Sequence, residues 1–159
     1  MKRTTTANTF AIAFATVVSL GIAPQAQADD KGCSNATLTG TFGITATGSI
    51  VAPPPIAGPF ANVGTQTFDG KGGTTGTATV SQNGNILKVT ITGTYTVNPD
   101  CTGSITLNLS SQNPPLSLTT HAFFVIDDSG AEFRAIQTDP GVVLTVIGRR
   151  QFPENDWRH

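Results

Sequence analysis

Hydrophobic and polar residues alternate along most of the chain. The stretch "KVTITGTYTV", residues 88–97, carries its apolar side chains at every second position and threonines between them. A period of two is typical of a β-strand with one buried face. We therefore expect one face of this strand to point into a core, through Val89, Ile91, Tyr95 and Val97, and the threonines to form a solvent-facing column, Thr90, Thr92, Thr94 and Thr96.

The same alternation, interrupted by recurring turn residues, predicts eight strands. They are expected near residues 38–50, 60–68, 74–82, 87–97, 103–109, 120–127, 131–138 and 142–150. No segment after residue 28 shows apolar residues at helical spacing. The sequence therefore predicts an all-β fold, a single antiparallel up-and-down β-barrel of about eight strands with one disulfide, or a closely related sandwich.

Three predicted hairpins support this order of strands. Asn83-Gly84 is a strong two-residue turn signal, and it places apolar residues opposite apolar residues. Turns at Ser129-Gly130 and at Pro140-Gly141 each bring Phe133 and Ala135 to the inner face. Because these two hairpins share a strand, their agreement supports both registers. The same register places Glu132 opposite Arg149 on the outer face, as a surface ion pair.

The first residues have the three parts of a secretory signal peptide. Lys2 and Arg3 precede the apolar run from Phe10 to Ala23, and "AQA" ends at Ala28. We expect cleavage after Ala28 and a secreted or periplasmic protein. The expected organisation is a signal peptide (1–28), a β-barrel domain (29–150) and a C-terminal tail (151–159).

The charge of the mature chain argues against nucleic acid as a partner. Residues 29–159 contain ten acidic and seven basic residues, a net charge of −3. No motif calls for a cofactor.

Two cysteines in an exported chain are expected to pair, as Cys33 with Cys101. Cys33 precedes the first strand, and Cys101 lies in the link between the fourth and fifth strands. In an up-and-down barrel both positions fall at the end where the first strand begins, which we call the lower end. Closing a loop of this length stabilises a fold by about 4 kcal/mol in the chain-entropy model.

Two proline-rich links, residues 51–59 and 111–117, are expected at the opposite, upper end, where they either frame a binding site or cap the core. The polar residues expected inside the barrel are the candidate ligand-binding residues Tyr95, Gln137, Asn62 and Gln66. The alternative is that these side chains bond one another in the core.

The chain carries no catalytic signature. It has no G-x-S-x-G elbow, and His121, its one internal histidine, is expected to face outward near the upper rim. Several aspartates collect at the lower end, but the spacing of a calcium loop is missing, and Asp beside Gly is ordinary turn chemistry. We expect no catalytic residue and no metal site.

The outer face of the predicted barrel is apolar over the sixth to eighth strands. In a soluble barrel we expect this apolar surface to be covered by the C-terminal tail or by another subunit of a homo-oligomer. Its residues are Phe123, Val125, Ile136, Val143 and Ile147. An outer-membrane barrel is disfavoured by the threonine column and by the low aromatic content, so we do not expect the protein to be membrane-embedded.

The segments "FDGKGGTTGTATVSQNG", "TGTYTVNPDCTGSITL" and "EFRAIQTDPGVVLTVIGRR" resemble a group of small exported bacterial proteins. The resemblance implies an eight-stranded barrel comparable in shape to calycins and to the allene oxide cyclase barrel, and it carries over no catalytic or ligand residue. The lipocalin G-x-W signature and the tryptophans of an avidin-type biotin site are absent.

The leading expectation is a non-enzymatic barrel that binds a small apolar ligand or serves as an extracellular interaction module. One alternative is a cyclase or isomerase that constrains a small apolar substrate inside the barrel. The other is a purely structural surface protein. The volume of the barrel interior is the observation that discriminates among them.

Overall fold

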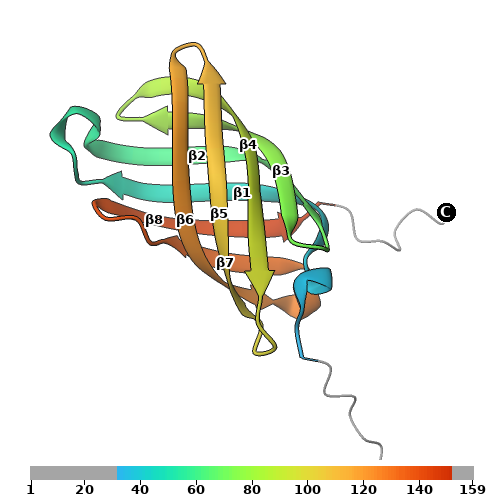
Figure 1. Cartoon of the computed structure of the whole chain (residues 1–159). Coiled ribbons are helices and arrows are strands. Elements are labelled where there is room, and N and C mark those ends of the chain that lie inside the picture. Colours follow the sequence, from blue (N-terminus) through green and yellow to red (C-terminus); the bar gives the residue numbers. More distant parts are fainter. Residues whose placement is uncertain (1–31, 152–159) are drawn as a thin grey trace, which may run out of the picture. The chain divides into compact units, whose positions relative to one another are not determined.

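A computed structural model describes residues 32–151, which form a closed antiparallel barrel of eight strands in chain order (Figure 1). The strands are β1 (Thr39–Ile50), β2 (Gly58–Asp69), β3 (Gly73–Gln82), β4 (Asn85–Val97), β5 (Thr102–Gln112), β6 (Pro115–Asp127), β7 (Glu132–Gln137) and β8 (Val142–Arg150). Three short 3-10 turns are η1 (Asn35–Thr37), η2 (Pro54–Ile56) and η3 (Asp128–Gly130). The predicted all-β, up-and-down barrel with one disulfide is confirmed.

The expected signal peptide and most of the expected tail lie outside the described residues. Within residues 32–151, none of the helices is long and apolar enough to cross a membrane.

The strand registers follow the alternation of the sequence. Val80 lies opposite Leu87, and Phe133 lies opposite Ile126 on one side and Gly148 on the other, as predicted. The four apolar residues of β4 from Val89 to Val97 are buried, and the intervening threonines are exposed. Alternate residues of each strand therefore fill the barrel, and the residues between them face solvent.

The expectation of a long proline-rich link at 111–117 was wrong. β5 runs to Gln112 and β6 begins at Pro115, so only Asn113 and Pro114 separate them. Pro115 is tolerated because it is the first residue of its strand, where its missing N–H breaks no ladder hydrogen bond. The β5–β6 hairpin is consequently longer than its sequence suggested.

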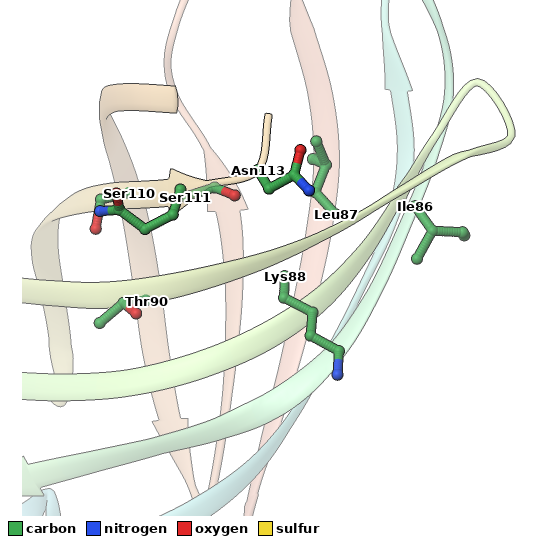
Figure 2. Close-up of a pocket in the computed structure, with 8 residues that line it drawn as sticks. Ile86, Leu87, Lys88, Thr90, Ser110, Ser111 and Asn113 are labelled. Carbon is green, nitrogen blue, oxygen red and sulfur yellow. The ribbon is translucent and has the colours of Figure 1, made fainter. Parts of the chain in front are cut away.

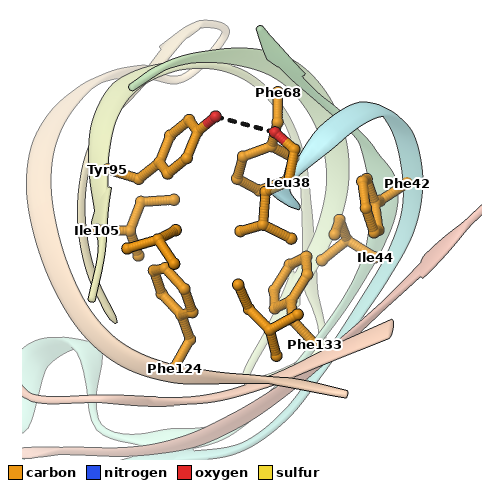
Figure 3. Packing of buried hydrophobic residues seen from close by; sticks show 10 residues of the cluster. Leu38, Phe42, Ile44, Phe68, Tyr95, Ile105, Phe124 and Phe133 are labelled. Atoms are coloured by element: carbon orange, nitrogen blue, oxygen red, sulfur yellow. Dashed lines mark hydrogen bonds between the residues drawn. The ribbon is translucent and has the colours of Figure 1, made fainter. Parts of the chain in front are cut away.

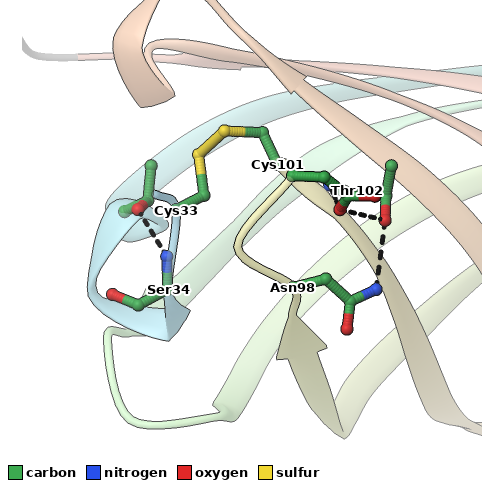
Figure 4. Close-up of a disulfide and its surroundings, with 7 residues drawn as sticks. Cys33, Ser34, Asn98, Cys101 and Thr102 are labelled. Carbon is green, nitrogen blue, oxygen red and sulfur yellow. Dashed lines mark hydrogen bonds between the residues drawn. A yellow bond between two sulfur atoms is a disulfide. The ribbon is translucent and has the colours of Figure 1, made fainter. Parts of the chain in front are cut away.

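The lower end is closed by the N-terminal segment. Cys33 and Cys101 form a disulfide with a Cα–Cα distance of 4.9 Å, which confirms the predicted pairing (Figure 4). The Cys33 N–H also donates to the Pro99 carbonyl at 3.0 Å, and the Val97 N–H donates to the Asn35 side chain at 2.8 Å. These bonds attach the segment before β1 to the β4–β5 turn.

The lower half of the lumen is filled by aromatic rings (Figure 3). The Phe68 ring lies at the centre of the group, with its centroid 5.4 Å from that of Phe42, 5.5 Å from Phe133 and 5.1 Å from Tyr95. Leu38, 1% exposed, packs among them from the N-terminal segment. These contacts make the lower half an aromatic core, with a void of about 40 Å³ beside Phe68, Phe124 and Phe133.

Glycine makes room for two of the rings. A Cβ on Gly148 would overlap the Phe133 ring, and a Cβ on Gly103 would overlap the Phe124 ring. Glycine in a strand interior often marks such a close approach.

Candidate ligand cavity and its polar lining

The upper half of the lumen contains a hollow beside a cluster of buried aliphatic residues, Ala78, Val80, Val89 and Ile91. A cavity of about 90 Å³ is lined by side chains from seven of the eight strands, among them Ala46, Phe60, Ala122 and Leu144. A smaller void of about 40 Å³ adjoins it, since both are lined by Gln66, Leu107, Ala122 and Val146. Ala46 and Ala122 contribute to the hollow, because their short side chains leave space that a larger inward residue would fill.

Three of the four candidate binding residues line this cavity: Asn62, Gln66 and Gln137. They come from β2 and β7. Tyr95 does not join them. It lies in the lower core, where its hydroxyl donates to the Leu38 carbonyl at 2.9 Å, and burial raises the pKa of its phenol.

The two β2 amides are held by protein partners. Gln66 Nε2 donates to Thr74 Oγ1 at 3.0 Å, and Thr74 Oγ1 donates onward to the Thr67 carbonyl at 2.9 Å. Asn62 Oδ1 accepts the Ala46 N–H at 3.0 Å. Each amide therefore has a fixed orientation in the cavity wall, and it retains further donor or acceptor capacity.

At the rim, Asp139 organises a polar network that sequence reasoning missed. Its carboxylate accepts the His121 backbone N–H at 2.8 Å and the Gln137 side-chain amide at 3.0 Å. It also lies 2.8 Å from His121 Nδ1. The network connects an inward amide of β7 with an outward imidazole of β6.

The electrostatics of Asp139 follow from these bonds. Burial alone would raise the pKa of its carboxyl, but the hydrogen bonds from His121 and Gln137 outweigh that effect and lower the pKa below 3.8. The carboxylate therefore stays ionised over the neutral range. His121 faces outward as predicted, with its side chain 54% exposed.

A larger groove, of about 500 Å³, lies outside this cavity where β4 and β5 diverge (Figure 2). Ile86, Leu87 and Lys88 line it from β4, and Ser110 to Asn113 line it from the other side. It is open to solvent, and its walls are strand edges. We therefore take the enclosed hollow as the better candidate for a small ligand, despite its smaller volume.

The carboxylates at the lower end are engaged locally. Asp69 accepts the backbone N–H groups of Lys71, Gly72 and Gly73, which lower its pKa, and Asp100 bonds Thr102. Glu132 pairs with Arg149 across the outer face, as expected. Within residues 32–151, no group of acidic, histidine or cysteine side chains is placed to hold a metal ion.

The expected apolar outer face is contiguous over β6, β7 and β8. Phe123 lies opposite Ile136, and Ile136 lies opposite Thr145, between Val143 and Ile147 on β8. Four of the five residues are exposed, and Val125 is half-buried. A homo-oligomer through this face stays a prediction.

The closed eight-stranded barrel is consistent with a calycin-like shape. Comparison of the chain with protein-family models, with curated proteins and with solved structures found no match.

Proposed function

We propose that this chain is a secreted or periplasmic, non-enzymatic barrel that binds a small apolar molecule in the upper half of its lumen. The observation that carries the proposal is the hollow of about 90 Å³, lined mainly by apolar side chains and by three amides. Such a mixture, mostly apolar with a few convergent polar groups, is typical of small-molecule sites. The disulfide is compatible with an oxidising compartment.

The volume limits the class of ligand. Drug-sized ligands occupy pockets of roughly 300–1,000 Å³, whereas an apolar cavity of about 150 Å³ holds a molecule such as benzene. The proposed ligand is therefore no larger than a single ring or a short chain that occupies the hollow together with the adjoining void of about 40 Å³, with one polar end that an amide of Gln66, Gln137 or Asn62 binds. A hollow this small leaves little room for the changes of shape that a cyclase or isomerase must allow its small apolar substrate, so its size favours binding.

The first experiment uses benzene as a probe of the hollow. Two-dimensional NMR of the oxidised protein should show benzene-induced shifts concentrated on residues that line the cavity. Ala122→Leu, which fills the hollow, should abolish these shifts. Ala61→Leu is the matched control, because Ala61 is exposed on β2 and the same enlargement there leaves the hollow unchanged.

The second experiment identifies the ligand class. Thermal shift and native mass spectrometry would be run against single-ring and short-chain compounds with one polar group. A ligand that binds the folded state and not the unfolded chain raises the unfolding temperature, and the rise grows with the logarithm of the ligand concentration above its Kd. If benzene moves the wild-type and Ala122→Leu spectra equally, and no compound of the panel raises the unfolding temperature, the proposal is wrong.

A further inference from the structure

The β5–β6 hairpin extends beyond its neighbours at the upper end. The β5–β6 register continues to Gln112 opposite Pro115, but the β4–β5 ladder ends at Thr90 opposite Ser110. On the other side, the β6–β7 register ends at Ala122 opposite Gln137. Figure 1 shows the hairpin projecting from the barrel. We call residues 111–120 the arm.

The backbone of the arm presents a free strand edge on the β7 side. The His121 carbonyl accepts the Thr138 N–H at 2.9 Å, so the backbone of His121 faces β7. Because strand residues alternate, the N–H and C=O groups of Ser117 and Thr119 face the same way. Within residues 32–151, no backbone group pairs with them on that side.

This free edge has two definite ends. Pro115 has no N–H to donate, and the N–H of His121 is already bound by the Asp139 carboxylate at 2.8 Å. The residues whose N–H and C=O groups both remain free are Ser117 and Thr119, on either side of Leu118. The free edge is therefore short and symmetric about one residue.

Apart from Pro115 at its end, the sequence of the arm does not protect this edge. Between Asp100 and Asp127 the chain contains no Asp, Glu, Lys or Arg. Natural proteins usually guard an open edge with charged residues, bulges or a covering segment. The side chain of Leu118, opposite Leu109 on the inner face of the arm, is 46% exposed.

We propose that the β6 edge of one chain pairs antiparallel with the same edge of a second copy, about a two-fold axis at Leu118. Ser117 then lies opposite Thr119 of the second copy, and the two pairs make four backbone hydrogen bonds. The two exposed Leu118 side chains become direct cross-strand neighbours, which removes apolar surface from water.

The sequence of this edge is suited to pairing with a second copy of the same chain. Residues 117–119 read hydroxyl, leucine, hydroxyl in both directions, so an antiparallel copy places a hydroxyl residue opposite a hydroxyl residue and leucine opposite leucine over these three positions. A two-fold axis makes such an interface isologous and closed, so pairing stops at a dimer. This inference goes beyond ligand binding in the lumen and does not depend on it.

The first test removes the outward hydrogen bonds without touching the barrel. Thr119→Pro deletes an N–H that makes no ladder bond in the single chain, and it eliminates two of the four bonds in the dimer. The Thr119 hydroxyl donates to Asn108 Oδ1 at 2.9 Å, so Thr119→Val is the matched control that loses this bond but keeps the N–H. By sedimentation, Thr119→Pro should raise the dimer dissociation constant at least about tenfold, and Thr119→Val should stay near the wild type.

The second test uses the two-fold axis itself. Leu118→Lys and Leu118→Glu should each be monomeric, because like charges lie opposite one another, while an equimolar mixture should form a heterodimer. Both substitutions are at an exposed position, so they provide the test if Thr119→Pro does not fold. A wild-type protein that stays monomeric at high concentration overturns the proposal. The proposal is also wrong if the Leu118 variants remain dimeric while Ile136→Lys, on the outer face, makes the protein monomeric.

Discussion

Removing the disulfide tests how the lower end stabilises the barrel. The paired substitution Cys33→Ala and Cys101→Ala releases a loop with a sequence separation of 68 residues. The chain-entropy expression gives about 4 kcal/mol for a loop of this size. A typical domain is stable by about 5–15 kcal/mol, so the variant should keep its fold with much of its stability lost.

Urea denaturation at neutral pH, followed by circular dichroism, measures this loss. The entropic account makes two linked claims: the midpoint should fall, and the slope with denaturant should rise, because the unfolded chain without its cross-link exposes more surface. Reduction of the wild-type protein should give the same two changes. A loss below about 1 kcal/mol with an unchanged slope would refute the reasoning, and would mean that Asn35 and Tyr95 hold the N-terminal segment equally well without the disulfide.

Two further predictions concern the core and the rim. Gly148→Ala places a methyl group against the Phe133 ring and should lower the free energy of unfolding by about 1–3 kcal/mol. The same urea denaturation measures this loss. An unchanged free energy of unfolding would mean that the ring moves freely. The lowered pKa of Asp139 means that its ionised form stabilises the fold above about pH 4, and that this contribution is lost as the pH falls through 3.8 toward the folded pKa. Thermal unfolding between about pH 6 and pH 3 should therefore show a smaller loss of stability for Asp139→Asn than for the wild type, and equal losses would contradict the assignment.

Strand identity and pairing could be predicted because both depend on local signals. In β4 the alternation from Lys88 to Val97 is uninterrupted, and the Asn83-Gly84 turn sets its register with β3. The disulfide followed from the same order of strands, because counting links places Cys33 and Cys101 at one end. These inferences need only neighbours in the sequence and the rule that links alternate between the ends.

The polar contacts of the site could not be predicted in the same way. The alternation of residues along the strands places the Gln137 side chain inside and the His121 side chain outside. It does not reveal that Asp139, beyond the end of β7, forms hydrogen bonds with both side chains. The same alternation places Tyr95 inside, and the order of strands places it near the lower end, but neither identifies its hydrogen-bond partners. Its partners, the carbonyls of Asn35 and Leu38, belong to a segment with no strand pattern. Such contacts depend on three-dimensional positions that period-two reasoning does not specify.

The length of the arm was missed for a related reason. A Pro-Pro pair at Pro114-Pro115 reads as a break in a strand pattern, and the serines and threonines around it read as a loop. The structure shows instead that proline takes the one strand position that needs no N–H. A proline pair between alternating segments is therefore as compatible with a tight hairpin as with a long link.

The two ends of the barrel differ in a way that bears on function. The disulfide, the aromatic cluster and the N-terminal segment all lie at the lower end, whereas the upper half has a smaller buried cluster of aliphatic residues, Ala78, Val80, Val89 and Ile91. The upper end keeps a hollow lumen and an unpaired strand edge, features that cost stability if they serve no purpose. The contacts of the lower end do not involve either feature. Substitutions that fill the hollow or block the edge should therefore leave the barrel folded while they remove binding or pairing, which is the pattern expected of a functional end rather than a structural one.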